Sequence, residues 1–174
     1  MSATKLVVHK IELLDDTPVR LNARRISPAR LKIMQDLVDK YLSEDVIEKC
    51  KSPLVSPPVL ASKSDGTWRL CIDYRQLNTK TKKHAYPIPI IDGLLDKFTN
   101  ARFITKIDLT LAFLQVLVDL KSRDYTAFAV RFKRMPFDLT NSPSTYQQMM
   151  DELICKLPDG AAEHIFAYLD DLCV

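Results

Sequence analysis

The chain has 174 residues, 47% of them hydrophobic, with 25 lysines and arginines against 22 aspartates and glutamates. This composition is typical of a folded domain with a buried core and excludes an intrinsically disordered tail. The three glycines, Gly66, Gly93 and Gly160, cannot form a P-loop or a dinucleotide-binding fingerprint. ATPases of the P-loop class and Rossmann enzymes are therefore excluded.

The cysteines and apolar segments indicate where the protein resides. The four cysteines lie too far apart for a paired zinc spacing, and the N-terminus has no signal-peptide pattern. No apolar run approaches the ~18 residues of a membrane span. We expect reduced cysteines and an intracellular protein without a membrane partner.

The first half of the chain predicts an arm, a helix and a hairpin. Residues 5–13 mix apolar and polar positions, as in an extended arm. Ser27-Pro28 is a helix start, and apolar residues then recur at helical spacing through Leu42. Prolines between residues 53 and 58 favour an extended path. Two apolar runs, residues 59–61 and 68–74, flank Ser64-Asp65-Gly66, which predicts a β-hairpin.

Basic residues concentrate in and after that hairpin. They are Arg69, Arg75, Lys80, Lys82 and Lys83. Such a cluster suits contact with nucleic-acid phosphates, but lysine-rich loops are also often simply solvated. The sequence leaves both interpretations open.

The second half alternates helices and strands without an internal repeat. We expect a short helix from Tyr86-Pro87 to Asn100, strands over residues 103–107 and 126–130, a helix starting at Asn141-Ser142-Pro143, and a final strand over residues 165–168. This order predicts an α+β fold with helices covering one face of a sheet.

Three aspartates follow predicted strands. Asp108 ends one strand, and Asp170 and Asp171 follow the last one. Adjacent carboxylates repel each other, and cations between them relieve that repulsion. Hard oxygen donors suit Mg²⁺, and two such ions ~4 Å apart catalyse in-line phosphoryl transfer. The alternative is an ordinary hairpin turn, where Asp-Asp pairs are common.

Several motifs in order resemble the reverse transcriptase of gypsy-like long-terminal-repeat retrotransposons. They are Ser52-Pro53 to Val59, Lys63 to Trp68-Arg69, Ile72-Asp73-Tyr74-Arg75-Gln76-Leu77-Asn78, Tyr86-Pro87-Ile88-Pro89, Lys106-Ile107-Asp108-Leu109, Met135-Pro136-Phe137, Leu139-Thr140-Asn141-Ser142-Pro143, and Tyr168-Leu169-Asp170-Asp171, which resembles the YxDD box. The resemblance implies a right-hand polymerase fold, with fingers through the Asp73 strand and palm from about Tyr86. It divides the chain into residues 1–58, an arm, helix and proline-rich lead-in, and residues 59–174, an incomplete fingers and palm core.

The resemblance also implies roles for single residues. Asp108, Asp170 and Asp171 match the ligands of two Mg²⁺ or Mn²⁺ ions. Lys63 and Arg69 match residues that hold the incoming triphosphate, a task suited to a point charge and a planar fork. Phe113 matches the aromatic residue that packs under the nucleotide sugar, where a bulky ring excludes a 2′-hydroxyl. Ala112, beside it, is also expected to bind the nucleotide. Nucleic-acid contacts are expected at Arg75, Lys80, Lys82, Lys83 and Gln147.

The chain departs from the family at four places, the smallest of which is Ala112, where the family usually has glycine. Asp138 stands where the family usually has glycine, so a position needing glycine's backbone freedom carries a charged side chain instead. The loop at residues 129–134 is shorter than usual, and β-branched Val130 falls at the expected reversal. Only three residues follow Asp171, so we expect a truncated palm whose return strand is too short to hold its carboxylates.

Three functions follow as hypotheses. The first is an RNA-directed DNA polymerase that acts on a primed RNA or DNA template with deoxynucleoside triphosphates, in a polyprotein that also holds a thumb and ribonuclease H. The second is a catalytically inactive, truncated remnant that at most binds nucleic acid. The third is a two-metal nuclease, which would need neither a triphosphate clamp nor a sugar gate. The first implies a cytoplasmic retrotransposon particle or the nucleus.

Overall fold

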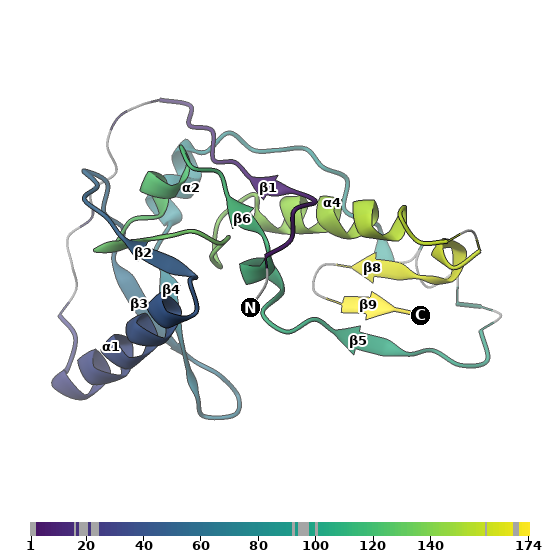
Figure 1. Ribbon diagram of the computed structural model, residues 1–174, viewed down its shortest axis with the longest axis horizontal. Helices are drawn as coiled ribbons and strands as arrows, with labels where there is room; N and C mark the ends of the chain where they lie inside the picture. The colour runs from purple at the N-terminus through teal and green to yellow at the C-terminus, as the bar shows by residue number, and fades with distance from the viewer. Residues whose placement is uncertain are drawn as a thin grey trace.

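The computed structural model describes residues 3–15, 17, 21, 25–91, 93, 98–99, 101–158, 160–168 and 171–174. Within these residues, four small sheets lie along an elongated body. Helix α1 and the sheets β2–β7 and β3–β4 form one end, and the sheet β5–β9–β8 forms the other (Figure 1). The described helices include none long and apolar enough to cross a membrane.

Helix α1 (Pro28–Ser43) begins where Ser27-Pro28 predicts it. Its Met34 and Tyr41 side chains are buried in the first hydrophobic cluster, together with Leu70 from strand β4 (Trp68–Ile72). This burial anchors the helix against the hairpin, although Leu31 from the same predicted stripe is 44% exposed.

The predicted hairpin is confirmed. Strand β3 (Pro58–Ser62) pairs antiparallel with β4, and the last register pair is Ser62 with Trp68. The five-residue turn closes through the Lys63 carbonyl oxygen, which accepts from the Gly66 N–H at 3.1 Å. Gly66 has φ +80°, a conformation that glycine adopts without steric cost. The turn therefore places Lys63 at the tip of the hairpin.

The strand predicted over residues 126–130 is wrong in position. Residues Arg123–Thr126 form the 3₁₀ helix η2, and the strand β7 is Val130–Phe132, paired antiparallel with β2 (Ile47–Lys49). The Thr126 hydroxyl oxygen accepts from the Phe132 N–H at 2.9 Å, which satisfies the backbone without a ladder. The reversal falls on Ala129, at φ 140°, rather than on Val130.

Pairing of β7 with β2 brings residues from distant parts of the chain into one core. Val130, Phe132 and Leu139 lie in the same hydrophobic cluster as Met34 and Ile72. Residues well beyond Tyr86 therefore complete the core of the fingers end, and residues on both sides of position 58 share it. Helix α2 (Arg75–Lys80) closes this end with the buried Leu77.

The N-terminal arm is extended, as predicted. Strand β1 (Val8–His9) pairs parallel with β6 (Leu117–Val118), and Leu13 forms a bridge with Thr81. The arm joins the two ends of the molecule (Figure 1). Its His9 is 1% exposed and reaches helix α4 (Ser142–Ile154), where the His9 Nδ1 lies 2.8 Å from Thr145 Oγ1.

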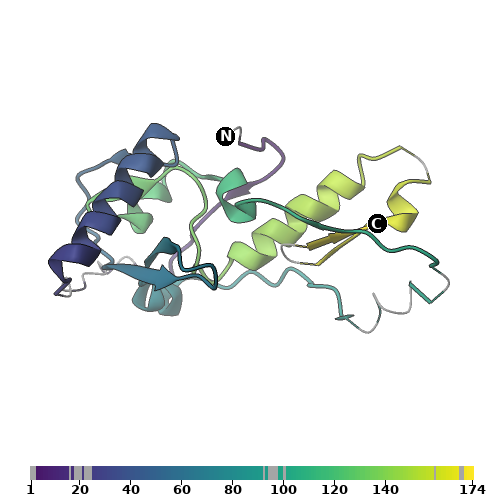
Figure 2. The ribbon, with the colours of Figure 1, turned by 90° about the horizontal axis from the view of Figure 1, so that it is seen from below.

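The palm end is a three-stranded antiparallel sheet with α4 packed on it (Figure 2). Its strands are β5 (Lys106–Asp108), β9 (Asp171–Cys173) in the middle, and β8 (Phe166–Tyr168), and short 3₁₀ helices η1 (Ala112–Gln115) and η3 (Ala162–His164) flank it. Helix α4 starts at the predicted Ser142-Pro143 and buries Tyr146, Met149 and Met150. The predicted helix does not start at Tyr86-Pro87, because residues 86–90 are not helical, although Ile91 and Gly93 are. Leu94, Leu95 and Asn100, which were expected in the same helix, lie outside the described residues.

Buried His9 makes stability depend on pH. Burial, with a smaller contribution from His84, lowers the pKa of His9 from 6.5 to about 4. Between these values the unfolded chain binds a proton that the folded protein does not, so stability falls as the pH falls. We expect the free energy of unfolding to drop by up to about 3 kcal/mol between pH 7 and pH 4.

Urea unfolding of the wild type and of His9→Gln over this pH range measures the drop. The variant should lose about that much less than the wild type, whereas His164→Gln, at an exposed position, should behave like the wild type. Equal pH dependence in wild type and His9→Gln would contradict this account.

Candidate active site

Asp108 and Asp171 face each other across two paired strands. The β5–β9 register places Asp108 opposite Asp171. Thr105 and Val174 exchange both backbone hydrogen bonds at 2.9 Å, so by alternation Asp108 and Asp171 form a non-hydrogen-bonded pair. Such pairs have Cα atoms about 4.5 Å apart and side chains on the same face of the sheet. Two of the predicted carboxylates therefore meet, while Asp170 lies outside the described residues.

The strand that carries Asp171 is paired on both sides. β9 lies between β5 and β8, with Tyr168 opposite Asp171 on the β8 side. Leu172 points to the other face, where it packs with Ala167 in the second hydrophobic cluster beside α4. The expectation of a return strand too short to hold its carboxylate is therefore wrong for Asp171.

The carboxylate pair fits a divalent cation by the chemistry of its donors. Asp108 is exposed and Asp171 is half-exposed, so both can offer oxygen ligands to Mg²⁺ or Mn²⁺. Within the described ranges no group of three or more His, Cys, Asp or Glu side chains is placed to hold a metal. A third carboxylate would have to come from Asp170.

Lys106 adds a cation to this face of the sheet. Its Nζ lies 2.8 Å from Asp171 Oδ2. The hydrogen bond to Asp171, with its negative charge, raises the pKa of Lys106. No local pattern assigns this lysine to the site, because the contact depends on strand register.

A cleft of about 390 Å³ lies between the fingers hairpin and the carboxylate strand. Four residues expected to bind nucleotide or metal line it: Lys63, Arg69, Asp108 and Ala112. Helix α1 forms a further wall, which sequence reasoning missed because that helix showed only an ordinary amphipathic pattern. The other lining residues are Leu37, Lys40, Tyr41, Glu44, Trp68, Leu109, Thr110, Leu111 and Phe137.

Phe113 supports the cleft rather than lining it. Its ring lies 5.4 Å from Tyr146 and 5.7 Å from Phe137, between centroids. The Arg69 guanidinium carbon lies 5.5 Å from the centroid of Phe137, a cation–π distance. The aromatic side chains thus form a column that ends under Arg69 and holds its guanidinium in the cleft.

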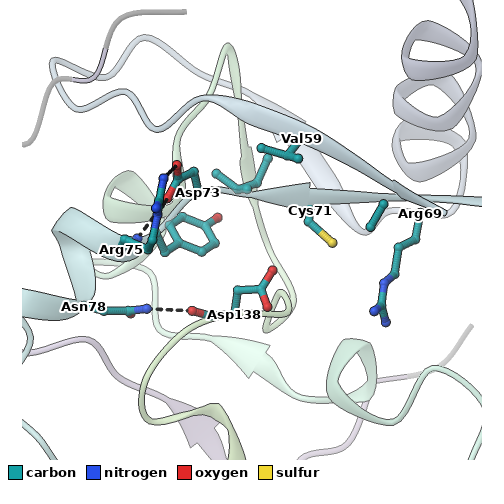
Figure 3. Close-up of a pocket in the computed structure, with 10 residues that line it drawn as sticks. Val59, Arg69, Cys71, Asp73, Arg75, Asn78 and Asp138 are labelled. Atoms are coloured by element: carbon teal, nitrogen blue, oxygen red, sulfur yellow. Dashed lines mark hydrogen bonds and ion pairs between the residues drawn. The ribbon is translucent and has the colours of Figure 1, made fainter. Parts of the chain in front are cut away.

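Arg69 also lines a second pocket of about 700 Å³, shown in Figure 3. There the Asp138 carboxylate lies on the same side as Cys71, and burial together with Asp138 raises the pKa of the Cys71 thiol. Asn78 secures the loop, because its Nδ2 donates to the Asp138 carbonyl oxygen at 2.7 Å and its Oδ1 accepts from the Thr140 N–H at 2.9 Å. Asp138 has φ 68°, the left-handed conformation expected where glycine is usual.

The predicted nucleic-acid contacts are placed unevenly. Arg75 forms a two-point contact with Asp73, at 2.8 and 2.7 Å. The Lys80 Nζ lies 3.1 Å from Asp15 Oδ1, and that of Lys82 lies 3.8 Å from Glu12, so the N-terminal arm neutralises part of the basic segment. Lys83 is exposed.

Gln147 has no exposed surface in this structure. It is 0% exposed, and its Nε2 donates to the Ala167 carbonyl oxygen at 3.1 Å and to Asp151 Oδ1 at 3.0 Å. A template strand could not reach it in this conformation. Its bonds instead connect α4 to the β8 strand that precedes the carboxylates.

Comparisons with known proteins agree with this geometry. Residues 61–174 match the family described as reverse transcriptase (RNA-dependent DNA polymerase). The chain therefore belongs to the reverse transcriptase family, which confirms the resemblance seen in the sequence.

Its relatives are retrotransposon polyproteins and retroviral enzymes. The chain is 32% identical to the retrovirus-related Pol polyprotein from transposon 412 of Drosophila melanogaster, over 100% of this chain and 15% of that polyprotein. The prototype foamy virus protease-reverse transcriptase superimposes with a TM-score of 0.83 at 25% identity, over 99% of this chain and 23% of the viral chain. The foamy viral enzyme in complex with an RNA/DNA hybrid superimposes with a TM-score of 0.82 at 23% identity, over 98% of this chain and 23% of the viral chain. The chain thus spans under a quarter of the length of these relatives.

The left-handed backbone at Asp138 predicts a gain from glycine. Asp138→Gly should raise the free energy of unfolding by up to about 1 kcal/mol, because glycine adopts this conformation without a steric cost. Asp138→Asn is the matched control, since asparagine also tolerates the left-handed region but removes the charge. Urea unfolding should show a gain for glycine and little change for asparagine. A gain of equal size in both variants would trace the effect to charge instead of backbone.

Proposed function

We propose that this chain forms the nucleotide-binding and carboxylate part of an RNA-directed DNA polymerase active site. The observation that carries the proposal is that Lys63, Arg69 and Asp108 line one cleft, with Asp171 opposite Asp108. Family membership supports the same reaction class. The substrates would be a deoxynucleoside triphosphate and a primer on an RNA or DNA template, and the foamy viral relative solved with an RNA/DNA hybrid supports this partner.

The carboxylates would hold the divalent cations. Asp108 and Asp171, together with Asp170, which the sequence resemblance assigns to the same role, would offer the hard oxygen donors that two Mg²⁺ or Mn²⁺ ions require. When bound, such a pair activates the primer 3′-hydroxyl and stabilises charge on the α-phosphate oxygens. The strand pairing on both sides of β9 would fix the direction of the Asp171 carboxylate.

The fingers residues would neutralise the triphosphate. Lys63 sits at the hairpin tip and can approach phosphate oxygens as a compact charge, while Arg69 offers a planar fork. The aromatic column under Arg69 restricts the positions of its guanidinium. Ala112 leaves room for the sugar, and Phe113 would limit that room from beneath Phe137.

Two other functions receive less support. A nuclease would not need Lys63 and Arg69 across the cleft from Asp108. The inactive-remnant hypothesis rested on a poorly held carboxylate strand, on Asp138, on the short loop at residues 129–134 and on a missing thumb. The first of these grounds is removed, because β9 is paired on both sides.

The test combines nucleotide binding with primer extension. The wild type should bind a fluorescent deoxynucleoside triphosphate in a Mn²⁺-dependent manner and extend a primed template. Asp108→Asn should lower extension on the order of 100-fold, and Arg69→Lys should weaken nucleotide binding because the fork is lost. Asp36→Asn, on the exposed face of α1, is the control and should change neither. Nucleotide binding that needs no metal and survives Asp108→Asn would contradict the proposal.

Salt dependence tests the basic segment separately. Because Lys80 is engaged by Asp15 while Lys83 is exposed, we expect unequal contributions to phosphate binding. Lys83→Ala should reduce the slope of log affinity against log salt for a primer-template by ~0.9, and Lys80→Ala should reduce it less. Fluorescence anisotropy measures both slopes over roughly 50–300 mM salt, where counterion release dominates the salt dependence of binding. Equal slopes in the wild type and Lys83→Ala would show that this segment meets no phosphate.

A further inference from the structure

Lys106 is placed to serve the carboxylate pair. It precedes Asp108 by two residues in β5, so the two side chains lie on the same face of the sheet. In the ladder, Lys106 is diagonal to Asp171, and its Nζ approaches Asp171 Oδ2 to 2.8 Å. The ammonium group therefore lies on the face where the two carboxylates meet.

The two carboxylates need a positive charge nearby. Like charges directly opposite each other in a non-hydrogen-bonded strand pair are destabilising. A cation on the same face reduces this repulsion, and among the residues in contact with Asp171 the structure records Lys106 in that role. In the metal-free protein, Lys106 thus reduces the repulsion between the two carboxylates, as a bound metal ion would.

The same contact opposes metal binding. Lys106 occupies Oδ2 of Asp171, an oxygen that a divalent cation would use. Metal binding at that oxygen would have to break the Lys106–Asp171 ion pair, and an exposed pair of this kind changes affinity by at most roughly fivefold. The lysine side chain is 62% exposed, so its flexible stem can move into solvent.

We propose that Lys106 is a positioning residue that acts as an internal counter-ion: it holds the Asp171 carboxylate in the metal-free protein and releases it when a divalent cation binds. This inference rests on the proposed function, because it assumes a metal at Asp108 and Asp171. It assigns to Lys106 a trade-off between metal-free stability and metal affinity.

Direct metal binding is the first test. Mn²⁺ binding followed by electron paramagnetic resonance should be tighter in Lys106→Met than in the wild type, by up to roughly fivefold. Lys106→Arg keeps the charge and should not tighten binding. Lys133→Met is the matched control, because Lys133 forms an ion pair of similar length with Asp45, at 2.6 Å, away from the carboxylate pair. Its Mn²⁺ affinity should equal that of the wild type.

Thermal unfolding is the second test, and it separates this role from simple strand packing. Without metal, Lys106→Met should melt at a lower temperature because the carboxylates lose their counter-ion. Saturating Mn²⁺ should raise its melting temperature by more than it raises that of the wild type, since ligand binding stabilises by mass action. A packing role would lower both melting temperatures equally, with and without metal. Lys106→Gln, which keeps a hydrogen-bond donor, replaces Lys106→Met if the latter does not fold.

The outcomes distinguish the two levels of the proposal. Mn²⁺ binding that depends on Asp108 but is equally tight in wild type and in both neutral Lys106 variants would overturn the counter-ion role alone. Absence of any Asp108-dependent Mn²⁺ binding in all variants would overturn the proposed function, and the inference with it.

Discussion

The register between β5 and β9 is the constraint on which the candidate site depends. Side chains alternate along a strand, so a slip of one residue would turn Asp171 toward α4 and Leu172 toward solvent. Two features oppose that slip: the paired backbone hydrogen bonds of Thr105 and Val174, and the packing of Leu172 with Ala167. Placement of the carboxylates thus follows from burial of apolar side chains on the opposite face of the same strands.

Helix α4 transmits this constraint to the rest of the molecule. Gln147 bonds the main chain of β8, and Asp151 accepts from both Gln147 and the Tyr86 hydroxyl, the latter at 2.7 Å. Two residues before Gln147, the Thr145 hydroxyl donates to the Asn141 carbonyl oxygen at 3.0 Å. The Thr145 hydroxyl oxygen therefore accepts from His9 Nδ1–H. A single helix therefore fixes the catalytic sheet, the segment at Tyr86 and the N-terminal arm. A buried polar chain of this kind tolerates the loss of a member poorly, because the remaining partners are left unsatisfied.

Local signals predicted the elements whose cause is local. The Ser-Pro starts of α1 and α4 and the Asp65-Gly66 turn are short-range features, and all three elements form as expected. Strand β7 was misplaced because its position is set by pairing with β2, more than 80 residues earlier, and no local pattern records that partner. Gln147 was misread for the same reason: a glutamine on an amphipathic helix gives no sign that a strand carbonyl will meet it. The opposition of Asp108 and Asp171 could be anticipated because both follow apolar strands, but the Lys106 contact required the register.

Charged side chains of both signs line the cleft, Lys40 and Glu44 at the end of α1 among them. The fingers side presents Lys63 and Arg69, and the palm side presents Asp108. Under the proposed function, a triphosphate with its divalent cations would contact the basic and the acidic residues at the same time. The loops that hold them carry two non-glycine residues in the left-handed region, Leu111 at φ 51° and Asp138 at φ 68°. Strained backbone persists where surrounding contacts over-determine it, and here the Asn78 bonds to the 138–140 loop provide such contacts. Asp45 and Ala129 also have positive φ, so strained backbone is not confined to the cleft, and the Asn78 bonds account for its persistence at Asp138.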